Sequence, residues 1–275
     1  MRLRVHHTTT YRYDPPAGSV IQILRLTPGN HDGQYVAEWQ VDVSADARLT
    51  QRRDAFGNIT HVFTADGPLS ELVVHVDGQV DTMDTGGVLR GTDEPFPPSL
   101  FLRTTELTQA DDAITAFANA LHKEAKGETL DFLHRLMSAL HARMIFDVDP
   151  TNPGTSAIEA FALGRGVCQD YAHIFVAAAR LLGVPARYVA GHFFRADGVV
   201  SQEAGHAWAE AYVPKLGWVG FDAANELCTT DAHLRVAVGL DCLGASPVRG
   251  TRFGGGSETL SVAVSVDQAG RQSQS

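Results

Sequence analysis

Cysteine is scarce in this sequence of 275 residues, which contains only Cys168, Cys228 and Cys242. Three cysteines that lie far apart do not form a disulfide framework, and they suit a reducing compartment. Structural zinc sites normally use close pairs such as Cys-x-x-Cys, and no such pair occurs here. The sequence therefore predicts a fold that depends on its apolar core rather than on covalent bridges.

Basic residues are also in the minority, because 22 lysines and arginines face 32 aspartates and glutamates, with a formal net charge of -10. Binding to nucleic acid or to an anionic membrane needs a basic surface, so the charge argues against both kinds of partner. Apolar runs long enough to span a bilayer are absent, and the residues after Met1 are too polar for a signal peptide. We therefore expect a cytoplasmic protein, and the sequence does not indicate its oligomeric state.

Alternating polar and apolar residues dominate the first third of the chain. Runs rich in Val, Thr and Tyr end at turns such as Asp14-Pro15-Pro16 and Pro28-Gly29-Asn30. Such short strands at regular spacing are typical of an antiparallel β-sandwich or barrel. Helical patterns and further strands follow. We predict an α+β protein with an N-terminal β-sandwich domain at 1–90, a linker at 91–106 and a catalytic domain at 107–275.

The most informative segment surrounds Cys168. Two glycines precede the cysteine, and an alanine- and leucine-rich run follows it as far as Gly183-Val184-Pro185. This pattern predicts a loop that leads into a helix beginning at Cys168. Free backbone N–H groups and the helix dipole stabilise an anion at that position, which favours the nucleophilic thiolate. A lone cysteine in a core helix is more often inert, so a catalytic role requires partners.

Two later segments supply candidate partners for the thiol. Residues 206–213 alternate strictly, which predicts a strand that begins with His206. After a turn at 214–217, residues 218–222 have the pattern of its hairpin partner. A cysteine nucleophile needs a base, and the base needs a third group to orient it. Cys168, His206 and Asp222 can supply these three parts.

The loop of this hairpin decides whether Asp222 can reach the base. Cross-strand neighbours lie on the same face of an antiparallel pair. If Val213 pairs with Trp218 across a four-residue loop, Asp222 faces away from His206. A loop of three or five residues, or a bulge, brings the two onto one face. We therefore predict an odd loop or a bulge at 214–217.

Four motifs resemble the transglutaminase-like superfamily, specifically the bacterial transglutaminase-like cysteine proteases. In chain order they are Gly166-Val167-Cys168-Gln169-Asp170-Tyr171-Ala172, Gly183-Val184-Pro185-Ala186-Arg187-Tyr188-Val189, His206-Ala207-Trp208-Ala209-Glu210 and Gly217-Trp218-Val219-Gly220-Phe221-Asp222. This match covers about residues 155–225. The first part of the chain looks more loosely like the β-rich domain of that group, notably at His7–Tyr13, Leu24–Pro28 and Asp54–Asn58.

The resemblance implies a papain-like core, in which a helix bearing the cysteine packs on an antiparallel sheet. It implies Cys168 as nucleophile, His206 as base and Asp222 as the orienting carboxylate. The expected activity is that of a thiol hydrolase, a cysteine protease or amidase, acting on a peptide or protein amide through an acyl-thioester. No cofactor is expected.

Two alternatives share this fold. A protein-glutamine transamidase uses the same acyl-enzyme, and hydrolysis is favoured because the sequence has no distinct second-substrate signature. A non-catalytic peptide-binding module is the other alternative, and the presence of all three triad residues argues against it. The chain also departs from the family pattern at two places. Asp222-Ala223-Ala224-Asn225 keeps the acid but alters the turn after it, and Gly239-Leu240-Asp241-Cys242 lacks the Arg and Tyr that relatives often carry, so we expect an atypical substrate preference if these two side chains line the cleft.

A metal site is the remaining alternative for these residues. Its ligands would have to come from Cys168, His173, His206, Cys228 and Cys242. Cys168 and His173 lie about 140° apart on a helix, so they could not easily share an ion. We predict no metal, and we place His173 on the polar side of the helix with Gln169 and Arg180.

Overall fold

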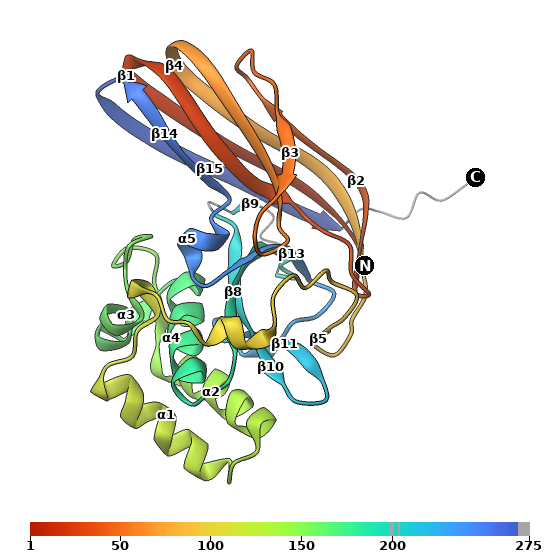
Figure 1. The fold of residues 1–275 in the computed structure, drawn as a ribbon, viewed down its shortest axis with the longest axis vertical. Helices are drawn as coiled ribbons and strands as arrows, with labels where there is room; N and C mark the ends of the chain where they lie inside the picture. Colours follow the sequence, from red (N-terminus) through yellow and green to blue (C-terminus); the bar gives the residue numbers. More distant parts are fainter. Residues whose placement is uncertain (198–200, 203, 269–275) are drawn as a thin grey trace, which may run out of the picture.

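The structure, a computed structural model, describes residues 1–197, 201–202 and 204–268. Most of its strands lie in two antiparallel sheets. The first sheet extends away from the helices, and the second lies between the first sheet and the helical layer (Figure 1). Within the described ranges, no helix combines the length and the apolar character needed to cross a membrane.

The first sheet is built around two long strands, β1 (Arg2–Thr27) and β4 (Ile59–Thr82). They pair antiparallel along most of their length, with an irregular stretch near Ala17. The strands β2 (Gln34–Val43) and β3 (Thr50–Arg53) both pair with β4.

Both long strands bend, and their halves face each other. Alternate residues of β1 are buried on either side of the bend, which is the period of a half-buried strand. The buried side chains of both halves form one cluster, which includes Tyr11, Leu24 and Phe63. Trp39, which pairs with the first half of the sheet, donates its indole N–H to the Leu26 carbonyl in the second half at 3.0 Å. The folded sheet therefore forms the two layers of the predicted sandwich.

The last two strands complete this first sheet. β14 (Val248–Gly254) pairs with the second half of β1, and β15 (Ser257–Gln268) pairs with the first half. The short β9 (Ser201–Gln202) pairs with β15. Residues 248–268 therefore pair with the first sheet, although they belong to the segment 107–275 that the sequence predicts as one catalytic domain. The period of a strand shows which face is buried but not which strand is its neighbour, so the sequence carried no signal for this return.

The second sheet carries two of the predicted site residues, His206 and Asp222. Its strand order is β12 (Leu227–Cys228), β11 (Gly217–Asp222), β10 (His206–Val213), β8 (Ala186–Phe193) and β13 (His233–Gly239), and β5 (Val88–Leu89) also pairs with β11. The helical layer consists of α1 (Asp112–Glu124), α2 (Thr129–Arg143), α3 (Ala157–Leu163), α4 (Cys168–Leu181) and the short α5 (Cys242–Ala245). The parallel pair β6 (Ile145–Phe146) and β7 (Arg165–Gly166) leads towards α4, and two 3₁₀ turns occupy Pro98–Leu102 and Glu106–Thr108.

Helix α4 packs directly on β10. Ala209 and Ala211 point from the strand into the same core cluster as Phe175 and Ala178 of the helix, and their small side chains let the two elements approach closely. The prediction that most of this helix is buried is confirmed. The predicted polar side is wrong at His173 and Arg180, because both are buried.

Buried polar residues of α4 are satisfied by loops that the sequence pattern did not reveal. His173 accepts the backbone N–H of Cys242 at its Nε2, at 3.1 Å. Arg180 donates to the carbonyl groups of Phe101, Ala186 and Leu240. A guanidinium can be buried in this way because several carbonyl oxygens replace its water shell.

A second buried arginine, Arg187, connects the second sheet with the segment that was predicted as a linker. Arg187 of β8 donates to Glu94 at 2.7 Å and to Glu210 of β10 at 2.6 Å. Its guanidinium lies 3.9 Å from the centre of the Trp218 ring, and its side chain is 1% exposed. Phe101 is buried as well, so the predicted linker is attached to the second sheet at Glu94 and Phe101, while most of its other residues are exposed.

Candidate active site

Cys168 is the first residue of α4, as predicted, and it is half-buried. The turn before it is fixed by Asp170, whose Oδ2 accepts the Val167 backbone N–H and the Thr151 hydroxyl, each at 2.8 Å. A side chain at Gly166 would place a Cβ 2.4 Å from the same oxygen, which explains the glycine. Because the first N–H groups of a helix have no partner within it, the backbone N–H of Cys168 is available at the site.

The hairpin that carries the other two predicted residues has an odd loop. Val213 pairs with Gly217, so residues 214–216 form a three-residue loop, and the prediction is confirmed. Lys215 and Gly217 have φ values of 72° and 93°, in the left-handed region that such loops use. Ala209 pairs with Phe221 farther along, which places Asp222 on the face of His206.

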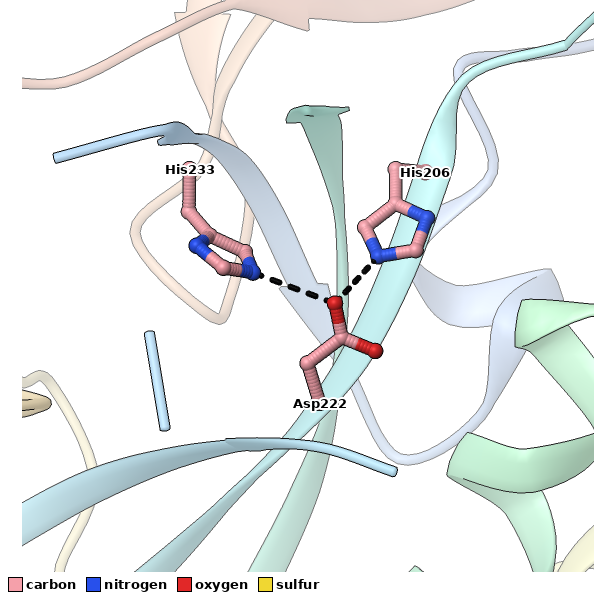
Figure 2. A group of neighbouring side chains, drawn as sticks. All are labelled: His206, Asp222 and His233. Carbon is pink, nitrogen blue, oxygen red and sulfur yellow. Dashed lines mark hydrogen bonds and ion pairs between the residues drawn. The ribbon is translucent and has the colours of Figure 1, made fainter. Parts of the chain in front are cut away.

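Asp222 and His206 form a short contact inside the protein. The Asp222 Oδ2 lies 2.6 Å from the His206 Nε2, and this carboxylate is fully buried while the imidazole is 11% exposed (Figure 2). With Nε2 engaged, Nδ1 is the ring nitrogen left for the thiol. Burial disfavours the charged imidazole, but the charges of Asp222 and Cys168 and hydrogen bonds to both raise the pKa of His206 to about 10. The structure therefore brings the three predicted residues together and favours the imidazolium.

The carboxylate of Asp222 accepts more donors than a triad requires. Burial alone would raise its pKa, but His206 and His233 hold the pKa of Asp222 well below its usual range. Asn225 donates its side-chain amide to Oδ2 at 2.7 Å and its backbone N–H to Oδ1 at 3.2 Å. Asn225 was not predicted, although its place three residues after the acid is typical of a turn that an aspartate caps.

His233, the first residue of β13, is the functional residue that sequence reasoning missed. Its Nε2 lies 3.1 Å from the Asp222 Oδ2, and its Nδ1 accepts the Thr230 backbone N–H at 3.1 Å. Nδ1 is therefore the acceptor, and Nε2 carries the proton that points at Asp222. Burial lowers the pKa of His233 despite the opposing charge of Asp222, so this imidazole is neutral. Figure 2 shows both imidazoles directed at one carboxylate oxygen.

The same three side chains have the spacing of a metal site. Ligand atoms of His206, Asp222 and His233 all lie within 4.8 Å of one another. A metal needs an unprotonated nitrogen, whereas the Thr230 N–H places the proton of His233 on the nitrogen that faces the group. The donor set thus fits a hydrogen-bonded carboxylate better than a metal centre.

The other residues weighed as metal ligands do not join this group. His173 is occupied by the Cys242 N–H, as described above, and the Cys242 thiol contacts the Pro153 carbonyl at 3.4 Å. Cys228 lies 3.6 Å from the Nε2 of His134 on α2. Burial raises the pKa of both thiols, to about 12 for Cys242.

Two family models match separate parts of the chain, and several known proteins resemble most of it. Residues 3–81 match the family described as the bacterial transglutaminase-like N-terminal region, and residues 115–223 match the transglutaminase-like superfamily. An uncharacterized protein of Mycobacterium leprae (strain TN) is 29% identical over 286 residues, which cover 96% of this chain and 98% of the relative. An uncharacterized protein of Mycobacterium tuberculosis (strain H37Rv) is 28% identical over 290 residues, with coverages of 97% and 92%.

A solved structure shares the whole fold. A candidate cysteine protease from Cytophaga hutchinsonii superimposes with a TM-score of 0.76 at 19% sequence identity, covering 99% of this chain and 92% of that one.

Proposed function

We propose that this chain, which belongs to the transglutaminase-like superfamily, is a thiol hydrolase that cleaves amide or peptide bonds of a peptide or protein. The observation that carries the proposal is the His206 imidazole, which Asp222 holds through Nε2 and whose pKa the neighbouring Cys168 helps to raise. A cysteine nucleophile, its base and the group that orients the base are thereby gathered at one site.

The first half of the reaction follows from these contacts. The Cys168 thiolate attacks the carbonyl carbon, a C–S bond forms, and the carbonyl electron pair moves onto oxygen. The backbone N–H of Cys168 at the start of α4 can donate to that oxyanion. When the pair returns, the C–N bond breaks, and the His206 imidazolium gives its Nδ1 proton to the leaving amine. The acyl group then remains on sulfur.

The second half needs a nucleophile that reaches the acyl-thioester. Neutral His206 takes a proton from water, whose oxygen attacks the carbonyl carbon, and the C–S bond breaks to release the acid and the thiolate. The imidazole retains contact with solvent through its exposed edge, which supports water as the acceptor. An amine in place of water would make the same site a transamidase.

The proposal is tested with a glutamine-bearing peptide and a panel of simple peptide amides, each with and without excess primary amine. We expect ammonia or amine release with free acid as the main product, and no turnover by Cys168→Ala. A dominant amide product at millimolar amine would assign transamidation instead.

Labelling with iodoacetamide separates both enzymes from a non-catalytic module. We expect Cys168 to react first near neutral pH, ahead of Cys228 and Cys242, because burial raises the pKa of those two thiols, and the order is followed by mass spectrometry. No turnover on the panel together with equal labelling of the three thiols would replace the enzymatic proposal with a binding function.

A further inference from the structure

Asp222 depends on contacts from outside its own hairpin. Its Oδ2 must face the His206 Nε2 for the imidazole to keep its orientation, and a carboxylate can rotate about its last bond. His233 blocks that rotation, because its Nε2–H donates to the same oxygen from another strand. The His233 ring is itself confined by Phe193, with ring centres 4.7 Å apart, and by Trp208, edge-on at 5.2 Å.

The backbone on either side of His233 is held by the first sheet. Two residues after it, Arg235 donates its N–H to the Gln34 side chain at 2.8 Å, and its carbonyl accepts from the same amide at 2.9 Å. Gln34, the first residue of β2, is 2% exposed and also donates to the Gly29 carbonyl at 2.8 Å. One buried side chain thereby serves as a strand-like partner for the start of β13.

A second attachment lies two residues before His233. The hydroxyl of Thr82, at the end of β4, donates to the Asp231 carbonyl, and the amino group of Met1 lies 3.5 Å from the Asp231 carboxylate. Thr82 pairs with Gln34 within the first sheet, and Met1 directly precedes β1. The segment 231–235 is therefore tied to the N-terminal sheet on both sides of the histidine.

We propose that His233 is a positioning residue for the triad, and that the N-terminal sheet holds it in place through Gln34 and Thr82. His233 acts through Asp222 and contacts neither the thiol nor the leaving group. This inference rests on the proposed function of the site and gives the N-terminal sheet a part in it.

The first test compares two replacements of His233. Glutamine can place an N–H donor where the Nε2–H lies, whereas leucine has similar bulk and no donor. We expect His233→Leu to lower kcat by about 10²-fold, the scale of a misplaced catalytic group, with KM nearly unchanged. His233→Gln should recover most of that loss. His75→Leu, on the exposed surface of β4, is the matched control and should behave as wild type.

Alkylation of Cys168 gives a readout that needs no substrate. The titratable groups around the imidazole are Asp222, Cys168, His233 and His192. When Asp222 is free to turn away from His206, the imidazolium loses support and with it the thiolate that it pairs with, so labelling of Cys168 near pH 7 should slow in His233→Leu and recover only as alkali ionises the thiol directly. His233→Gln should restore the wild-type rate near pH 7.

The second test concerns the first sheet. Gln34→Ala removes both hydrogen bonds to Arg235, and we expect the same change of the labelling profile as in His233→Leu, to a smaller extent. Gln40→Ala, on the exposed side of the same strand, is the control.

The outcomes separate this inference from the proposed function. If wild-type Cys168 labels selectively and both His233 variants match it in kcat and in labelling profile, the positioning role is refuted. If His233→Leu behaves as expected and a folded Gln34→Ala does not, the part assigned to the N-terminal sheet is refuted. If wild-type Cys168 is not selectively reactive, the proposed function itself fails.

Discussion

Replacing Asp222 by asparagine tests the electrostatics of the site. The substitution keeps the size of the side chain and can leave an oxygen for the donors at the Oδ2 position. It removes the negative charge, and it places an NH₂ group opposite the backbone N–H of Asn225, which now donates to Oδ1 at 3.2 Å. One hydrogen bond is therefore lost, and the imidazole loses its counter-charge.

The size of the effect follows from the imidazole. The pKa of His206 is raised from 6.5 to about 10 although burial opposes the charge. Without the carboxylate, burial remains and Cys168 is the other source of support. If about half of that rise is lost, the change is roughly 2 kcal/mol at about 1.4 kcal/mol per pKa unit. The equilibrium constant for forming the thiolate–imidazolium pair from the neutral thiol and imidazole would then fall about 30-fold, since each 1.4 kcal/mol is about a factor of 10.

The measurement is the rate at which iodoacetamide alkylates Cys168 as a function of pH. In the wild type we expect fast labelling across the neutral range. In Asp222→Asn the rate near pH 7 should fall, by at most about 30-fold, because the fraction of thiolate cannot change by more than the equilibrium constant does, and it should recover as alkali ionises the thiol directly. Asp66→Asn, at the exposed bend of β4, is the matched control. Wild-type rates and an unchanged profile in Asp222→Asn would refute the assignment of Asp222 as the partner of the base.

Two further predictions concern stability. Arg187→Met leaves Glu94 without its arginine partner and Glu210 with Arg235 alone, so the free energy of unfolding in urea should fall by about 3 kcal/mol. Arg12→Met breaks an exposed pair with Glu71 and should lower it by under about 1 kcal/mol. Equal losses in the two variants would contradict the role of burial. Burial lowers the pKa of His7 and His173 to about 4 and of His192 to about 3, so the unfolded state binds more protons and stability should fall as the pH drops from 6.5 towards 4. His206 has a raised pKa, so its contribution to folding stability is complete below pH 6.5 and is lost as the pH rises through about 10. Together these groups predict a stability maximum near pH 6.5. A His192→Leu variant whose free energy of unfolding falls as steeply as that of the wild type below pH 6.5 would contradict this account.

Local patterns were sufficient for the parts of the site that depend on neighbouring residues in the chain. Glycine before Cys168 and helix formers after it located the start of α4. Strict alternation in β10 placed His206 on one face, and the requirement that Asp222 share that face predicted an odd loop or a bulge after Val213, which the three-residue loop confirms. Both features are set by backbone periods of a few residues, which a sequence displays directly.

The rest of the site depends on pairings between distant segments. His233 reaches Asp222 because β13 pairs with β8 and not with the hairpin that carries the acid, and Gln34 reaches Arg235 across 201 positions in the chain. The alternation of a strand shows which of its faces is buried but not which strand pairs with it. No motif therefore distinguished His233 from the other histidines of the chain. The same limit explains β15, whose period predicted a strand but not its place beside β1. The residues that local sequence revealed are thus those proposed to do the chemistry, whereas the residues proposed to hold them in position became visible only when the two sheets were placed against each other.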